Sequence, residues 1–199
     1  MRTILLGIIS LILSGCMGMP RLVTPVKEFE LEKYLGTWYE IARLDHSFER
    51  GLSQVTAVYS LRDDGGIRVR NSGYSAGTDE WKQAEGKAYF VNSEDEGYFR
   101  VSFFGPFYSS YVIFGLDQKN YHHAFVSGYN TSYLWLLSRS PTVDEKIIRE
   151  FIQSAHDSGF DTDQLIFVEQ DRNIKDFRAS SSAKQQPGQA PIHRIRPGQ

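Results

Sequence analysis

Cysteine is nearly absent from this chain of 199 residues, because Cys16 is the only one. A single thiol excludes an intramolecular disulfide, so the fold must depend on its core and its hydrogen bonds. An excess of one charge is also lacking, since 22 Lys and Arg side chains face 24 Asp and Glu side chains, for a net charge of −2. This balance gives no electrostatic reason to expect a nucleic-acid partner.

No apolar run is long enough to cross a bilayer as a stable helix. The run from Ile4 to Leu13 follows Arg2 and covers about half of the residues that a membrane helix needs. A basic residue, a short apolar segment and small residues are typical of a signal peptide. Leu13-Ser14-Gly15-Cys16 resembles a bacterial lipobox, which implies cleavage before Cys16 and a lipid anchor on its thiol. Met17, in place of Asp, implies sorting to the outer membrane. An ordinary signal peptide with an incidental cysteine is the alternative.

The rhythm of a parallel α/β sheet is missing too. Residues 73–77 read Gly-Tyr-Ser-Ala-Gly, the G-x-S-x-G pattern of a hydrolase nucleophile elbow, and Asp117 and His156 follow in an order that a serine triad uses. An elbow needs a buried parallel strand followed by a helix. Residues 67–71 instead alternate polar and apolar, and residues 78–86 carry no apolar helical stripe. We therefore interpret the pattern as a turn between strands, with no catalytic residue.

The histidines do not indicate a metal centre. His122 and His123 are adjacent, and adjacent residues of a strand face opposite sides of the sheet. No further histidine or acidic cluster stands at metal-ligand spacing. The sequence therefore predicts neither a metal site nor a cofactor.

Aromatic side chains, by contrast, are plentiful at 14%. They occur in runs of four to eight residues that are also rich in Val and Ile. Residues that favour turns separate these runs, which is typical of strands. Eight strands joined by short loops suggest a meander that closes into a barrel with room for one small ligand. The predicted strands are 37–44, 54–62, 67–74, 84–91, 98–104, 110–117, 122–128 and 133–139.

One helix follows the strands. Thr142 and Glu145 form a capping-box pattern, with Thr142 as the N-cap, and Gly159 suits the position after the helix. Its apolar residues share one face, which we expect to lie against the outside of the barrel. Residues 165–169 are expected to form a short ninth strand. From Arg172 the chain is basic and rich in Ser, Gln, Pro and Gly, so we expect disorder.

A Gly-x-Trp pattern opens the first strand. Gly36 allows close approach of the backbone, and Trp38 can plug the end of a barrel. Arg139 ends the eighth strand, which lies beside the first in a closed barrel, so its guanidinium can stack on the indole. We expect these three residues to close the base and not to contact a ligand.

With these features the chain resembles the lipocalin family. The resemblance covers residues 34–169 and rests on "YLGTWYEIARLDHSFERGL", "YSLRDDGGI", "EGKAYF", "VSFFGPFY" and "YLWLLSRSPT". One departure is Ser132, where many lipocalins have Asp. The resemblance implies an all-β, eight-stranded antiparallel up-and-down barrel that binds fatty acids, lysophospholipids or similar amphiphiles in the cell envelope, without catalysis. Dimers occur in the family, so a homodimer stays open.

Strand alternation assigns the inner wall of the barrel. The side chains that we expect to line a ligand cavity are Tyr59, Val69, Phe90, Val101, Phe103, Tyr111 and Ile113. Plain core packing without ligand contact is the alternative for each.

The expected domain plan has four parts. Residues 1–15 form a cleaved signal peptide, residues 16–27 a lipidated anchor and linker, residues 28–171 the lipocalin domain, and residues 172–199 a basic tail. Two other functions stay open. Glu40 shares strand parity with Trp38, so it could serve an enzyme that acts on a bound lipid, and a barrel filled by its own side chains would be an interaction protein.

Overall fold

The computed structural model describes residues 18–173 and 175, so Cys16 and most of the predicted tail lie outside the described residues. Within this part of the chain, strands form a single sheet. They are β1 (Gly36–Arg43), β2 (Leu52–Leu61), β3 (Ile67–Ser75), β4 (Glu80–Phe90), β5 (Tyr98–Phe104), β6 (Phe107–Leu116), β7 (His123–Ser127), β8 (Leu134–Ser138) and β9 (Ile166–Phe167). The helical elements are α1 (Leu31–Tyr34), α2 (Glu145–Asp157) and the 3₁₀ turn η1 (Thr162–Gln164), and residues 171–173 are helical as well.

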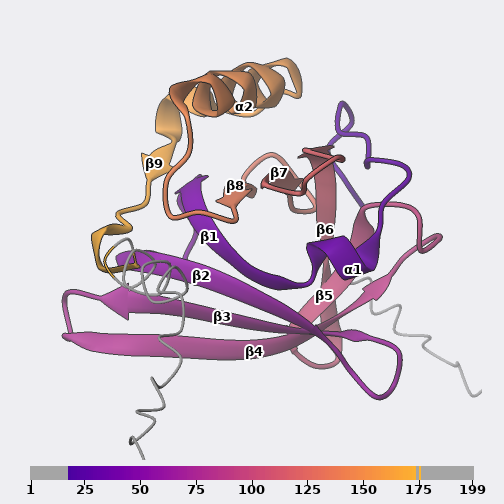
Figure 1. Cartoon of the computed structure of the whole chain (residues 1–199), viewed down its shortest axis with the longest axis horizontal. Coiled ribbons are helices and arrows are strands. Elements are labelled where there is room, and N and C mark those ends of the chain that lie inside the picture. Colours follow the sequence, from indigo (N-terminus) through magenta and orange to yellow (C-terminus); the bar gives the residue numbers. More distant parts are fainter. Residues whose placement is uncertain (1–17, 174, 176–199) are drawn as a thin grey trace, which may run out of the picture.

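Eight of the strands close into the predicted antiparallel barrel (Figure 1). Neighbouring strands pair in sequence order from β2 to β8, β8 pairs with β1, and β1 returns to β2. Closure pairs the backbone N–H and C=O groups of the edge strands, which would otherwise be free to bond to another chain. The turns after β1, β3, β5 and β7 lie at one end of such a meander, which we call the open end. The turns after β2, β4 and β6 lie at the other, the closed end.

The β3–β4 hairpin extends further than predicted. β4 begins at Glu80 and pairs there with β3, whereas its pairing with β5 begins only at Lys87. Residues 80–85 are exposed on both faces, so they show no alternation of polar and apolar side chains. Ser75 belongs to β3 and pairs with both Leu52 and Glu80. The turn between the strands lies at residues 76–79, so the predicted turn includes Ala76 and Gly77 but not residues 73–75, and an antiparallel hairpin still excludes a nucleophile elbow.

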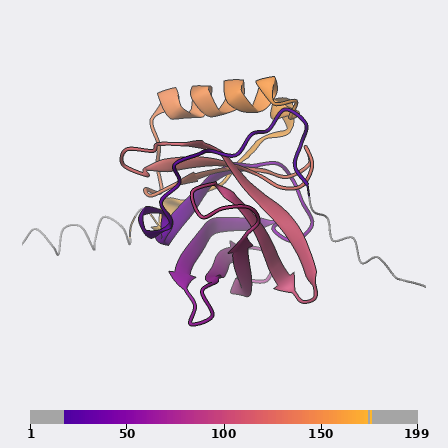
Figure 2. The same ribbon diagram turned by 90° about the vertical axis from the view of Figure 1, so that its right-hand side faces the viewer.

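Helix α2 lies on the outside of the barrel, as Figure 2 shows. Its buried Phe151 packs edge-on against Phe125 of β7, with ring centroids 5.2 Å apart. The predicted N-cap was wrong: Asp144 holds that position without a side-chain capping bond. The hydroxyl of Thr142 lies instead 3.4 Å from that of Ser140. Gly159 follows the helix with φ +85°, as expected for a residue in the left-handed region.

The seam between β1 and β2 is completed by β9 and by the residues that follow it. The two strands pair only from Gly36 to Tyr39, after which β1 pairs with β9. The buried amide of Gln170 donates to the carbonyl of Glu40 at 2.7 Å and to that of Val55 at 2.9 Å, so it bridges the split. The guanidinium carbon of Arg172, predicted to start the disordered tail, lies 3.8 Å from the centroid of the Tyr74 ring. None of the described helices is long and apolar enough to cross a membrane.

Candidate ligand-binding interior of the barrel

Two hydrophobic clusters divide the barrel into an inner and an outer core. The outer cluster joins Val112, Phe125 and Leu136 to Phe151 of α2. The inner cluster takes residues of opposite parity, such as Ile113, and therefore faces the barrel axis. All seven predicted wall residues belong to the inner cluster: Tyr59, Val69, Phe90, Val101, Phe103, Tyr111 and Ile113. The structure thus brings them together, while their contact with a ligand stays a prediction.

The inner wall is not uniformly buried. Tyr59, Val69 and Ile113 are buried, but the other four of the seven are only partly so. These four side chains therefore keep accessible surface although they belong to the inner cluster.

At the closed end, Trp38 and Arg139 form the contact that the sequence predicted. The guanidinium carbon of Arg139 lies 3.9 Å from the centroid of the Trp38 ring, and Trp38 is fully buried. Arg139 also donates to the carbonyls of Thr37 at 2.9 Å and Lys33 at 2.6 Å. Gly36 adopts φ +95°, and a Cβ there would lie 3.4 Å from the Arg139 guanidinium. The closed end is thus held by one cation over one indole.

Helix α1, which was not predicted from the sequence, covers this end. Its Tyr34 is buried, and its carbonyl accepts the indole N–H of Trp38 at 2.8 Å. The hydroxyl of Tyr111 lies 2.7 Å from that of Tyr34 and 2.8 Å from that of Tyr59, so three tyrosines share one hydrogen-bonded chain. Burial raises the pKa of Tyr34 and Tyr111 well above the usual range. These phenols are therefore neutral and add polarity without charge.

The open end, in contrast, buries charge. Glu40 accepts from Arg43 Nη1 at 2.6 Å, and both side chains are almost fully buried. Arg43 Nη2 donates to the carbonyls of Glu49 at 3.0 Å and Leu52 at 3.1 Å, which ties down the loop between β1 and β2. Glu49 accepts the indole N–H of Trp135 at 3.1 Å. This set, Glu40, Arg43, Glu49, His46 and Trp135, is called the mouth cluster below.

The two carboxyl groups of the mouth cluster are shifted in opposite directions. Burial, followed by the nearby charge of Glu49, raises the pKa of Glu40 well above its usual range despite Arg43. Burial is the largest influence on Glu49 and opposes its ionisation, but the contributions of His46, Trp135 and Glu40 together outweigh burial and lower the Glu49 pKa. Burial thus favours the protonated form of Glu40, and protonation lowers the charge that the cluster must bury.

Glu40 was a candidate from the sequence, but its partners in the mouth cluster were not. Simple alternation places Glu40 and Arg43 on opposite faces, because they are three residues apart. A bulge between Glu40 and Ala42 shifts the register against β8 and returns Arg43 to the same side. The signal for the bulge was absent from the residue pattern, so the cluster was visible only in the structure.

Aromatic rings lie beside the mouth cluster. The His46 ring stacks on Phe48 with centroids 4.0 Å apart and lies 5.1 Å from the Trp135 ring. Phe48 is 59% exposed, so this stack reaches from the buried cluster to the surface.

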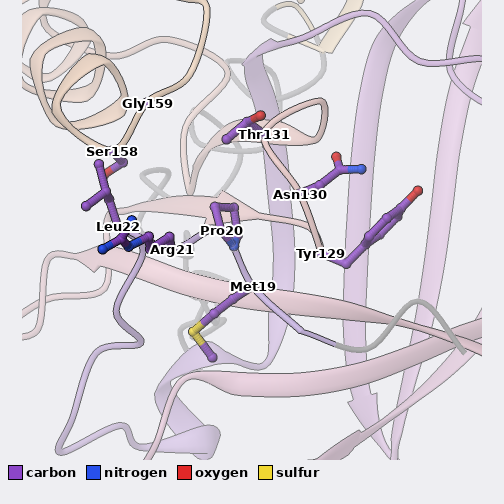
Figure 3. A pocket seen from close by; sticks show the side chains of 9 residues that line it. All are labelled: Met19, Pro20, Arg21, Leu22, Tyr129, Asn130, Thr131, Ser158 and Gly159. Atoms are coloured by element: carbon purple, nitrogen blue, oxygen red, sulfur yellow. The ribbon is translucent and has the colours of Figure 1, made fainter. Parts of the chain in front are cut away.

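The surface carries a separate hollow of about 550 Å³ (Figure 3). It lies between the N-terminal segment, the β7–β8 loop and the residues after α2. Its walls are Met19, Pro20, Arg21, Leu22, Tyr129, Asn130, Thr131, Ser158 and Gly159. None of the seven predicted wall residues borders it, so it is not the predicted ligand site.

Comparison with known proteins agrees with this geometry. The family described as "Lipocalin-like domain" matches residues 29–170. The chain belongs to the lipocalin family. Outer membrane lipoprotein Blc of Vibrio cholerae is 64% identical over 170 residues, covering 85% of this chain and 99% of that protein. Blc of Escherichia coli K12 is 52% identical over 151 residues, covering 76% and 85%.

A solved structure shares the lipocalin fold as well. Insecticyanin of the tobacco hornworm Manduca sexta superposes with a TM-score of 0.61 at 21% identity, covering 76% of this chain and 86% of that one. At this identity the likeness concerns the fold alone. The closer relatives are outer membrane lipoproteins by name, and this lipocalin is likewise an outer membrane lipoprotein. The predicted attachment residue, Cys16, lies outside the described residues.

Proposed function

We propose that this lipocalin binds single lipids, fatty acids or lysophospholipids, inside its barrel and stores or carries them in the bacterial cell envelope. The observation that carries the proposal is the inner wall itself. Seven side chains assigned from strand parity share one apolar cluster, and four of them keep accessible surface. An acyl chain placed there would bury apolar area worth roughly 25 cal/mol per Å², before the cost of ordering it.

The polarity of the two ends supports one orientation. The closed end holds neutral phenols under a covered base, so it suits the hydrocarbon end of a ligand. The mouth cluster holds Arg43 and His46 beside two carboxyl groups, so it suits a polar head group. We therefore propose that the lipid enters tail first through the open end.

We propose binding without turnover. Glu40 was the candidate acid for an enzyme, but it is ion-paired to Arg43 and its pKa is raised by burial. A carboxyl group fixed in this way by a buried arginine serves the packing of the mouth. Loss of turnover of a lipid substrate in Glu40→Gln would contradict this view.

Uptake of a fluorescent fatty acid by the purified full-length protein tests binding. Val101→Gln adds a polar group to the inner wall of β5, and we expect affinity to fall about tenfold or more. Arg70→Gln on the exposed outer face of β3 is the matched control and should leave affinity unchanged. Thermal unfolding of both variants separates lost binding from lost folding.

Native mass spectrometry of protein purified from its host identifies what the barrel holds. A co-purified lipid of one acyl chain is the expected result. A barrel that carries no lipid and takes up no fluorescent fatty acid would favour the filled-barrel alternative. The same spectra report whether the protein is a monomer or the homodimer that the family resemblance leaves open.

A further inference from the structure

The β5–β6 turn exposes two large rings. Phe104 is 82% exposed and Phe107 is 62% exposed, and they are cross-strand partners at the tip of the hairpin. Phe104 is the most exposed of the large hydrophobic side chains described for this chain. We call Phe104–Phe107 the hairpin tip. Such adjacent apolar rings in contact with water mark a surface that meets an apolar partner.

Basic and aromatic side chains stand directly behind the tip. The guanidinium carbon of Arg100 lies 5.3 Å from the centroid of the Tyr108 ring, and Lys87 Nζ lies 5.9 Å from it. Arg100 also lies 5.6 Å from the Tyr89 ring. Tyrosine with lysine or arginine is the combination that proteins place at the head-group level of membranes, where cations meet phosphate and rings meet the acyl boundary.

The nearby acid does not cancel this charge. Glu85, on the same outer face of β4 as Lys87, pairs with Arg68 at 3.2 Å. The cations behind the tip are therefore available for phosphate oxygens.

The anchor begins close to the tip. The backbone N–H of Gly18 donates to the hydroxyl of Ser110 on β6 at 3.0 Å. Ser110 is three residues from Phe107, a separation of about 10 Å along a strand. Cys16, the predicted attachment residue of the lipid, precedes Gly18 by two residues in the sequence. A lipid on Cys16 thus holds the β6 side of the barrel at the membrane.

We propose that the hairpin tip inserts into the head-group layer of the same membrane that holds the lipid anchor, and so presents the open end of the barrel to the phospholipids. Phe104 and Phe107 would lie at the acyl boundary, with Tyr108, Arg100 and Lys87 among the phosphates. The inference depends on the anchor and on the tip, and it stands or falls independently of whether the barrel holds a lipid.

The test uses the lipidated full chain in vesicles of phosphatidylethanolamine and phosphatidylglycerol. Cys16 is the only cysteine and its thiol carries the lipid, so an introduced cysteine takes a spin label alone. Gly105→Cys places the label between the two rings, where a Cβ meets no atom within 4 Å. Lys119→Cys, in the exposed β6–β7 turn at the closed end, is the matched control.

We expect the label at position 105 to lie within the membrane by its accessibility to oxygen, and the label at 119 to lie in water. Adding Phe104→Ser and Phe107→Ser should return the label at 105 to water, although the anchor still holds the protein on the vesicle. A label at 105 that lies in water in the unchanged tip would overturn the proposal. So would strong dipolar coupling between labels of two molecules, because the rings would then cover each other in a second copy of the chain.

Discussion

The two ends of the barrel are packed with different kinds of side chain. At the closed end, Trp38 and the phenols are buried and neutral, and the partly exposed Arg139 lies over the indole. At the open end, Arg43 and two carboxyl groups are buried beneath the β1–β2 loop. Buried charge is costly and needs partners, whereas neutral aromatic packing does not. The closed end therefore packs neutral rings, whereas the open end must satisfy buried charge.

Exposed aromatic rings follow the same division. The turns and strand ends at the open end expose Phe48, Trp81, Phe104 and Phe107, whereas the turns of the closed end expose Leu61 among the large hydrophobic side chains described. Substitutions of the same residue type at each end, compared by their effect on stability, test this difference.

The largest expected effect comes from two tryptophans. Trp38→Ala removes a fully buried ring and should lower the free energy of unfolding by about 3–5 kcal/mol. Trp81→Ala, at the open end, removes a ring that is 50% exposed and should cost less than about 1 kcal/mol. Urea unfolding measures both. Equal losses would show that the ends do not differ in this way.

Two arginines give the next comparison. Arg43→Met leaves the buried Glu40 without its ion-pair partner and frees two loop carbonyls, so we expect a loss of about 3 kcal/mol. Arg139→Met removes a partly exposed cation from Trp38 and should cost about 1–2 kcal/mol. Urea unfolding at neutral pH again supplies the measurement. A greater loss for Arg139→Met would place the stronger ionic contact at the closed end.

The tyrosine chain predicts a smaller difference within the closed end. Tyr111→Phe removes the central hydroxyl, so the hydroxyls of Tyr34 and Tyr59 both lose their hydrogen-bond partner. We expect the free energy of unfolding to fall by about 1–2 kcal/mol. Tyr59→Phe leaves the bond between Tyr34 and Tyr111 intact and should cost less. If the two variants unfold at the same urea concentration, the chain does not act as a unit.

The smallest effect is a dependence on pH at the open end. The folded-state pKa of Glu40 is raised, so its contribution to stability is full below the unfolded pKa and is lost as the pH rises through the folded value. Glu40→Gln removes this titration. The stability of the unchanged protein relative to Glu40→Gln should therefore fall as the pH rises from acid to alkaline, as measured by urea unfolding across that range. A constant difference would mean that Glu40 titrates normally.

Much of the barrel was predictable because its signals are local. All eight barrel strands were found from alternation and turn residues, and the Gly-x-Trp pattern located the first strand and its closed end. The errors have local causes as well. Residues 80–83 were missed because an exposed ribbon shows no alternation, and Thr142 was chosen as N-cap although its hydroxyl lies near that of Ser140.

The sequence alone determined the strands, their order, which face of each strand is apolar and where the lipid anchor is expected, because each of these depends on residues close together in the chain. Only the tertiary structure decided the contents of the two ends. A single bulge beside Ala42 brings Arg43 to the side of Glu40, and the amide of Gln170, 130 residues after Glu40, bridges the seam that β1 and β2 leave open. Such contacts join distant residues through one register shift and one returning segment, and no local pattern in the chain encodes either.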